Sequence, residues 1–473
     1  MATATRVLQL SPARPDADAL GGVTVHVAAL AEHAPASVTT LTAYPSGDEL
    51  LVEAWKPRRL VAALPLTARA LDAALAGTNA GVLHVHSPQF GPDAIVTAVK
   101  RAGVRLVVAM HEHALVCENY ELLEGGRRYC GIPTDLARCD RCLAVTRARP
   151  AGSLGVYRAT AARLVDAADV FVAPSRSVAE LAARVHPALA SRVRHLPWGV
   201  PLPLARRGRM PETGPLRVAI VGVWARVKGT EVLPALLEAC RHLDVEWHLF
   251  GATEGASLAG VRRSGARIVV HGAYRRPLLA TRLVHAGCHV VALPSIGAET
   301  FSLALGEVTA AGFPVLASDL GALGERVRDG ALGWLFDPFT PASFADAVSR
   351  LVANRAELER VAVHVATLPL RDERDMARDH ATLWTELGAL APRPADSPSS
   401  GQSREESLAT YAKGVARAGS RRPSRLEALF DRLKKSDFYR DLRLRQILPE
   451  GARKAIEQGL RRPSYRRPRA KDR

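Results

Sequence analysis

Two glutamates, Glu299 and Glu307, flank the expected start of a helix. The apolar run 290–293 predicts a buried strand before them, and we expect the helix from about Phe301 to Ala311. If the segment is helical, the carboxylates lie roughly 12 Å apart along its axis. A helix start leaves backbone N–H groups free to bind an anion. Here these groups belong to Thr300, Phe301, Ser302 and Leu303. A nucleotide sugar, with hydroxyls on both sides of a diphosphate, fits this order of groups.

A lysine in a second loop could place a cation beside the same diphosphate. The run 216–221 predicts a buried strand, and a loop bounded by Gly222 and Gly229 separates it from a helix expected to run to Arg241. Lys228 lies at the end of this loop, just ahead of the helix. A mobile ammonium group next to free backbone amides suits a diphosphate.

Loops after two N-terminal strands carry further candidate residues. Gly21 and Gly22 follow the first expected strand, and glycines at such a turn let a ligand approach the backbone closely. His111 follows the strand expected over 104–110, at the carboxyl end, where ligands bind in open α/β sheets. We interpret His26, one turn into the first helix, as a packed or solvated histidine.

The segment 294–336 resembles the Glu-x7-Glu region of the family 4 retaining glycosyltransferases, which have the GT-B fold. Besides the two glutamates, the resemblance rests on Gly312-Phe313-Pro314-Val315, Gly321, Glu325, Asp329-Gly330 and Gly333-Trp334-Leu335-Phe336. Weaker similarity extends it to about residues 6–388. The resemblance implies that Glu299 contacts the transferred sugar and that Glu307 contacts the ribose.

The same resemblance implies roles for the other loops. His111 would face the transferred sugar, and the first glycine loop would lie beside the donor phosphates and the acceptor. The chain departs from the family at Val223, where an arginine is usual. Either Arg226 supplies a second cation from nearby, or phosphate binding depends on Lys228 alone.

The implied architecture is α/β, with two Rossmann-like domains that face a cleft, as in GT-B proteins. We expect an acceptor-side domain over 1–200, a hinge over 201–215, a nucleotide-sugar-binding domain over 216–370, a helix crossing back over 371–390 and a basic, partly disordered tail over 391–473.

The implied activity is transfer of a sugar from a nucleotide-sugar donor to the hydroxyl of a glycan or lipid-linked acceptor, with retention and without a metal ion or other catalytic cofactor. A role in surface polysaccharide or lipopolysaccharide synthesis follows from the resemblance only. Two alternatives stay open. The chain could be another GT-B enzyme, a nucleotide-sugar epimerase or a phosphorylase, or a degenerate transferase that acts as a scaffold.

Four cysteines lie close together in a Gly/Pro-containing stretch: Cys117, Cys130, Cys139 and Cys142. A set that ends in Cys-x2-Cys fits a tetrahedral structural zinc site. The second Cys-x2-Cys pair of a typical site is missing, so reduced thiols without a metal are an equal alternative, and a disulfide or redox role is a third.

The positive charge is concentrated in the tail. The formal charge is +17, and residues 393–473 contain 22 Lys/Arg against 10 Asp/Glu, which leaves +5 for the remainder. A basic amphipathic pattern over 424–448 fits an anionic membrane surface, an acidic partner or a plain charged extension. We expect no nucleic-acid binding because no recognisable nucleic-acid-binding module is present.

Without a signal peptide or a membrane-spanning run, we expect a cytoplasmic protein, peripheral at the inner face of the membrane if the tail binds there.

Overall fold

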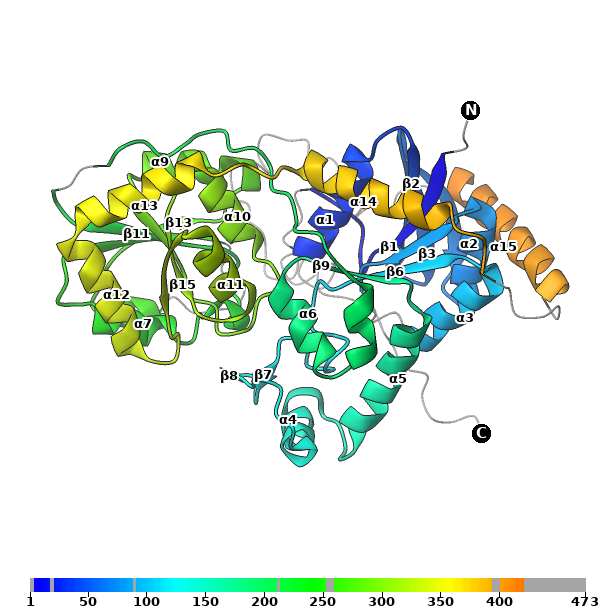
Figure 1. Cartoon of the computed structure of the whole chain (residues 1–473), viewed down its shortest axis with the longest axis horizontal. Coiled ribbons are helices and arrows are strands. Elements are labelled where there is room, and N and C mark those ends of the chain that lie inside the picture. Colours follow the sequence, from blue (N-terminus) through cyan, green and yellow to red (C-terminus); the bar gives the residue numbers. More distant parts are fainter. Residues whose placement is uncertain are drawn as a thin grey trace.

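The computed structural model describes residues 4–17, 21–87, 91–210, 213–251, 259–393 and 400–420. These residues form two lobes, each an α/β domain, joined side by side (Figure 1). The predicted basic amphipathic stretch over 424–448 lies outside the described residues. Within them, no helix has both the length and the apolar composition needed to cross a membrane.

The N-terminal domain is built on an eight-stranded sheet with the order β10-β9-β6-β5-β1-β2-β3-β4. Its strands are β1 (Thr5–Leu10), β2 (Val38–Ser46), β3 (Glu49–Trp55), β4 (Arg58–Pro65), β5 (Val82–Val85), β6 (Arg105–Ala109), β9 (Val170–Ala173) and β10 (Val193–His195). The pairs from β10 to β2 are parallel, whereas β2, β3 and β4 pair antiparallel. The helices of this domain are α1 (Gly22–His33), α2 (Ala70–Thr78), α3 (Pro92–Ala102), α5 (Ser153–Ala167), α6 (Arg176–Ala183) and the 3-10 helix η2 (Pro187–Arg192).

Both faces of the central part of this sheet are covered, which explains why the strands β5, β6 and β9 are largely apolar. Successive side chains of a strand point to opposite faces. Val7 accordingly packs with α1 and the later helix α14 (Glu373–Gly388), whereas Leu8 packs in the core on the other face. Val107 and Leu106 of β6 divide in the same way.

The C-terminal domain has a six-stranded parallel sheet with the order β13-β12-β11-β14-β15-β16. Its strands are β11 (Leu216–Val221), β12 (Val245–Phe250), β13 (Arg267–Gly272), β14 (Val290–Leu293), β15 (Val315–Ser318) and β16 (Gly333–Phe336). Its helices are η3 (Arg226–Lys228), α7 (Leu233–Ala239), α8 (Ala259–Arg263), η4 (Arg276–Leu278), α9 (Leu279–His285), α10 (Leu303–Ala310), α11 (Gly321–Gly330), α12 (Pro341–Ala353) and α13 (Arg355–Thr367).

The chain then returns to the first domain through α14, which lies across the N-terminal lobe in Figure 1. A parallel bridge between Val200 and Asp372 joins the outgoing and returning segments. Met376, Ala377 and Trp384 of α14 are fully or nearly fully buried in the same core as Val7. A further helix, α15 (Ser400–Ser420), packs against α2 and β4 at the far side of this lobe.

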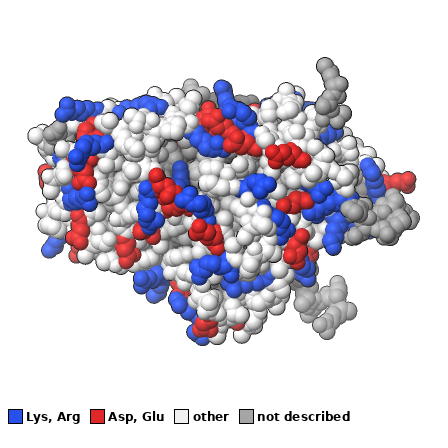
Figure 2. All heavy atoms as spheres, viewed as in Figure 1, with Lys and Arg blue, Asp and Glu red and all other residues white. Residues whose placement is uncertain are grey.

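The cysteine-containing stretch projects from the N-terminal lobe, where Figure 1 shows β7, β8 and α4 together below α6. It holds a short hairpin, β7 (Leu123–Glu124) and β8 (Arg128–Tyr129), and the helix α4 (Leu136–Arg147). On the face of the molecule seen in Figure 2, basic and acidic side chains are interspersed rather than gathered in one basic patch.

Candidate active site

Glu299 lies in the loop between β14 and α10, where neighbouring side chains hold its carboxylate. The ammonium of Lys228 is 2.8 Å from Oε2, and the Ser295 hydroxyl donates a hydrogen bond to Oε1. The Glu299 side chain is 9% exposed. Burial by itself would raise its pKa, but the Lys228 charge and the hydrogen bonds from Lys228, Ser295 and Ser302 outweigh this, so the net pKa is lowered. Glu299 is therefore an ionised carboxylate at neutral pH.

Lys228 lies beside Glu299 because the loop that carries the lysine and the loop that carries the glutamate contact each other through their backbones. Ile296 N–H donates to Val227 O at 2.9 Å. Gly229 has φ +89°, and a Cβ there would lie 1.9 Å from Pro294 O. Only glycine allows this approach and this backbone conformation, which accounts for a glycine directly after the lysine.

The lowered pKa of Glu299 predicts a defined pH dependence of stability. A carboxyl with a lowered folded-state pKa stabilises the fold above its unfolded pKa, here about 4.5, and loses that contribution as the pH falls through the folded pKa. The difference in unfolding free energy between the wild type and Glu299→Gln should therefore be constant above the unfolded pKa. It should change as the pH falls from there through the folded-state pKa. Urea unfolding at a series of pH values measures it. A difference that changes only above neutral pH would contradict the assignment.

Helix α10 begins two residues later than predicted, at Leu303, because Ser302 forms its N-cap and its hydroxyl accepts a hydrogen bond from Leu305 N–H. Ser302 has φ +67°, a conformation that non-glycine residues rarely adopt. Among the described residues, the N–H groups of residues 300–303 donate no hydrogen bond. They therefore remain available to an anion, although only one of these residues belongs to the helix itself.

Glu307 has a partner that the sequence did not reveal. Arg276, from η4, donates through Nε to Glu307 Oε1 at 2.6 Å, and both side chains are largely buried. Burial raises the pKa of Glu307, and the Arg276 guanidinium opposes this only in part. A ribose hydroxyl could accept from or donate to this pair. The 31-residue separation of the two residues left no local pattern by which to find Arg276.

The N-terminal domain meets the Glu299 loop directly. Thr300 Oγ1 donates to His111 O at 2.8 Å, and His113 Nε2 lies 2.8 Å from Ala298 O. A Cβ on Gly22 would approach Leu303 Cδ1 to 3.4 Å, so the first glycine loop lies opposite the start of α10. The structure thus brings His111, Gly22 and the Glu299 loop to one junction between the domains.

Arg226 has partners other than Glu299. Its Nε is 2.9 Å from Glu231, its Nη1 reaches Gly126 O at 3.5 Å, and its side chain is 55% exposed. Of the two cations considered from the sequence, Lys228 is the one that contacts Glu299 in this structure.

Glu325 joins the two domains at a helix terminus. Its carboxylate accepts hydrogen bonds from the backbone N–H groups of Arg176 and Ser177, at 2.9 and 2.7 Å, at the start of α6. A carboxylate at this position satisfies free amides and interacts favourably with the helix dipole. Arg176 also forms an ion pair with Asp329.

Comparisons with known proteins show the family of the chain. The family described as "Glycosyltransferase Family 4" matches residues 20–203, and "Glycosyl transferases group 1" matches residues 216–354, so that together they cover more than half of the chain. The chain belongs to the family 4 glycosyltransferases.

Relatives of this glycosyltransferase match it over part of their length. A D-inositol 3-phosphate glycosyltransferase of Xylanimonas cellulosilytica is 31% identical over 228 residues, which is 42% of this chain and 52% of the relative. A phosphatidyl-myo-inositol mannosyltransferase of Mycobacterium leprae is 44% identical over 71 residues, 15% of this chain and 19% of the relative. At best, the chain spans about half the length of the first curated relatives it matches.

Solved structures show the fold. Sucrose-phosphate synthase from Thermosynechococcus elongatus superposes with a TM-score of 0.59 at 20% identity, over 82% of this chain and 100% of that one. HepE from Anabaena, in complex with UDP, gives a TM-score of 0.55 at 15% identity, over 81% and 100%. The glycosyltransferase therefore has the GT-B fold predicted from its sequence.

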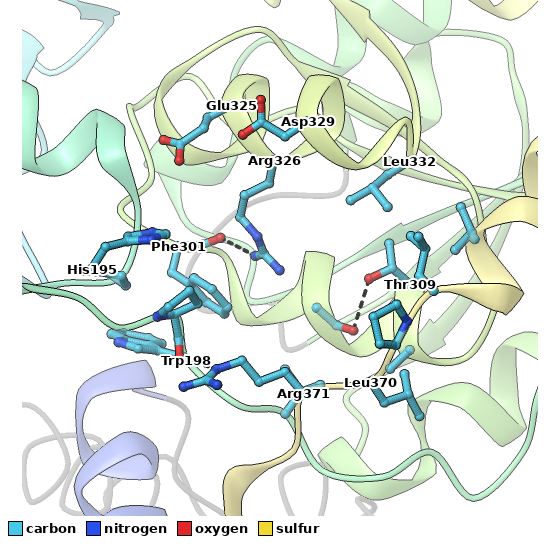
Figure 3. Close-up of a pocket in the computed structure, with 18 of the residues that line it drawn as sticks. His195, Trp198, Phe301, Thr309, Glu325, Arg326, Asp329, Leu332, Leu370 and Arg371 are labelled. Carbon is cyan, nitrogen blue, oxygen red and sulfur yellow. Dashed lines mark hydrogen bonds between the residues drawn. The ribbon is translucent and has the colours of Figure 1, made fainter. Parts of the chain in front are cut away.

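A cavity of about 290 Å³ lies at the junction of the two domains, on the face of α10 that carries Gly306 and Thr309 rather than Glu307. Figure 3 shows Arg326 extending from α11 toward the backbone of Phe301 beside this cavity. Arg326 Nη1 donates to Phe301 O at 2.6 Å and to Ser302 O at 3.1 Å, and its guanidinium lies 3.9 Å from the Phe301 ring centroid. Arg326 thereby holds the two carbonyls that precede α10.

We predict that Arg326→Met lowers the free energy of unfolding by about 2–4 kcal/mol. The carbonyls of Phe301 and Ser302 would lose their hydrogen-bond donor, and this donor helps to hold the backbone conformation of Ser302. The matched control is Arg328→Met on the same helix, an exposed residue paired with Asp319, for which we expect less than about 1 kcal/mol. Urea unfolding of both variants measures the difference. Equal unfolding midpoints would show that Arg326 does not support the loop.

The four cysteines of the projecting stretch are free thiols that lie near one another. Burial raises the pKa of Cys117 to about 11, with smaller contributions from the charges of Cys130, Cys139 and Cys142. Cys142 Sγ accepts a hydrogen bond from Gly125 N–H at 3.3 Å. Among the described residues, the side chains grouped closely enough to hold a metal ion do not include these four cysteines. The structural zinc site stays a prediction.

Proposed function

We propose that this protein transfers a sugar from a nucleotide-sugar donor to an acceptor hydroxyl with retention of configuration. The observation that carries the proposal is the Lys228–Glu299 pair, 2.8 Å apart, beside the free amides of residues 300–303. A cation and backbone donors suit a leaving diphosphate, and the carboxylate suits the hydroxyls of the sugar to which that diphosphate is attached.

The donor would lie along the loop from Glu299 to Glu307. In this placement the sugar contacts Glu299 and His111, the diphosphate lies at the start of α10 beside Lys228, and the ribose reaches the Glu307–Arg276 pair. A nucleotide sugar is supported as the donor class because HepE was solved with UDP and with UDP-glucose.

The reaction would form one bond and break another on the same face of the sugar. The acceptor oxygen bonds to the anomeric carbon as the bond from that carbon to the phosphate oxygen breaks. The acceptor proton passes to the leaving phosphate oxygen, so no separate base is required. Lys228 and the amides before α10 stabilise the charge that develops on the diphosphate, which lowers the barrier if they bind it more strongly in the transition state than before.

For the acceptor we propose a glycan or a lipid-linked polyol of surface polysaccharide or lipopolysaccharide assembly. Two relatives are named for inositol-containing acceptors, one of them a phospholipid. The basic segment 393–473, with 22 Lys/Arg against 10 Asp/Glu, supports peripheral binding to an anionic membrane that would carry such an acceptor.

Two measurements test the proposal. The first is a thermal-shift screen of the full chain against nucleoside diphosphates and their sugars; one nucleoside series should raise the Tm by mass action. The second is product analysis with that labelled nucleotide sugar. Acceptor-dependent release of nucleoside diphosphate together with a retained glycosidic product supports transfer. An isomerised nucleotide sugar, or sugar phosphate formed with inorganic phosphate, would identify the epimerase or phosphorylase instead, and no binding or turnover would leave a scaffold.

A further inference from the structure

Five buried histidines lie together in the N-terminal domain and include His111. This histidine cluster consists of His26, His84, His86, His111 and His380. Neighbouring rings have centroids between 4.0 and 5.8 Å apart. Its members come from α1, from β5 and the position directly after it, from the loop after β6, and from α14. No member is more than 7% exposed, so the fold gathers five imidazoles in a space closed to bulk water.

Many ring nitrogens of this cluster have no hydrogen-bond partner among the described residues. Both nitrogens of His26 and both of His84 are unpaired, as are His111 Nδ1 and His380 Nε2. A buried polar atom without a partner is costly and rare in native proteins. Burial away from water disfavours the charged form of an imidazole. Neutral imidazoles with free lone pairs are the form that binds metal ions.

Three of these residues are arranged as a ligand set. His26, His86 and His111 each offer a ring nitrogen, and the three atoms lie within 4.8 Å of one another. His86 Nδ1 is 2.9 Å from His111 Nε2. The other nitrogen of His86, Nε2, lies 3.0 Å from Gln9 Oε1. If Nε2–H donates to this oxygen, the lone pair of His86 is on Nδ1 and faces the other two rings. Histidines that bind a metal ion commonly donate their other ring N–H to an oxygen in this way.

We propose that His26, His86 and His111 bind one divalent transition-metal ion, preferably Zn²⁺, with Gln9 orienting His86. Three histidines with a fourth position left open form a known type of zinc site. The Trp198 ring packs 4.7 Å from His26 and 4.8 Å from His111, measured between centroids, which closes one side of the site with an apolar surface. The ion would tie α1 to the loops after β5 and β6.

This site goes beyond the proposed sugar transfer and does not depend on it. The proposed chemistry uses Lys228 and backbone amides for the leaving group, so the ion would hold His111 in place rather than take part in the reaction. A metal bound to His111 Nε2 leaves the ring proton on Nδ1, which is then a hydrogen-bond donor. Metal content can be measured without any substrate, so failure of either proposal leaves the other untouched.

The test uses the full chain, purified without a metal-affinity step and dialysed against a chelator. Titration with Co²⁺ should give one equivalent of bound ion with the visible absorption of a tetrahedral nitrogen-ligated site, displaced by Zn²⁺, and Zn²⁺ should raise the Tm by several degrees. His26→Gln should abolish the absorption, and Gln9→Leu should weaken Co²⁺ binding about 10–100-fold.

Matched controls separate this site from other sources of binding. His248→Gln replaces a buried histidine of the C-terminal domain, paired with His271 and Glu246, and should leave the cobalt absorption unchanged. The double variant Cys139→Ser/Cys142→Ser should also retain it, since the proposed site has no thiolate. His86→Asn is measured alongside, and near-ultraviolet circular dichroism of the metal-free variants shows whether each is folded.

Several results would overturn the proposal. One is wild-type protein that binds no cobalt, which would leave ordered water as the partner of the orphan nitrogens. Others are absorption that survives in folded His26→Gln or His86→Asn protein, or that is lost only in the cysteine double variant.

Discussion

Glu299→Gln is expected to lower the turnover of sugar transfer by at least about 100-fold, with the fold intact. The substitution keeps the size of the side chain but removes the charge that Lys228 contacts at 2.8 Å and that we place against the sugar. Losing one well-placed electrostatic contact in a buried site typically costs a factor of this order. Release of nucleoside diphosphate from the donor, in the presence of acceptor, measures the effect.

The matched control for this variant is Glu231→Gln. Glu231 is half exposed and pairs with Arg226 on the same side of the domain, so its loss should change turnover less than about threefold. If folded Glu299→Gln protein turned over as fast as this control, the assignment of Glu299 to the site would be wrong.

Lys228→Met should lower kcat/KM for the nucleotide sugar by about 100- to 1000-fold, the range seen when one donor to a developing negative charge is removed. A second effect follows from burial. Burial is the largest influence on the pKa of Glu299 and acts to raise it, whereas Lys228 opposes it. Without the lysine the pKa of Glu299 should rise. As the pH is lowered, the variant should therefore lose its remaining activity at a higher pH than the wild type does.

Arg226→Met provides the comparison. Because Arg226 is exposed and bonded to Glu231 and Gly126, its loss should change kcat/KM less than about threefold. Steady-state kinetics of Lys228→Met and Arg226→Met, measured across a range of pH, show which of the two cations binds the diphosphate. A larger effect for Arg226→Met than for Lys228→Met would mean that the arginine is the phosphate cation and that the loop rearranges when the donor binds.

The fold could be predicted because the patterns that indicate its strands, loops and helices each lie within a short stretch of the sequence. Apolar runs such as 216–221 and 290–293, each followed by a glycine-containing loop and a helix, indicate a parallel α/β sheet without any knowledge of distant contacts. Lys228 could be singled out in the same way, because it lies at the end of a glycine-bounded loop just ahead of a helix. The contact of Gly229 with Pro294 joins distant segments and could not be predicted. The start of α10 also has a local signal, because Ser302 precedes the apolar residues as an N-cap residue does.

Other parts of the candidate site depend on contacts between distant segments. Arg276 meets Glu307 across 31 residues, and Arg326 meets Phe301 across 25, with no periodic pattern to connect them. His26 could be interpreted only as a packed or solvated residue, because its neighbours His86 and His380 come from other elements. Such pairs are fixed by the order of strands in the sheet and by the return of α14, and a single sequence does not display them.

The return of α14 also sets an order of events during synthesis. Met376 and Trp384 complete the core that contains Val7, so the first domain cannot finish folding until residue 388 has left the ribosome. The sheet of the second domain, by contrast, comes from one uninterrupted segment that emerges earlier. Although domains usually mature from the N-terminus onward, the second lobe of this chain can become native first. A nascent polypeptide stalled before α14 would then carry an unfinished first lobe with exposed apolar surface, the kind of species that chaperones bind.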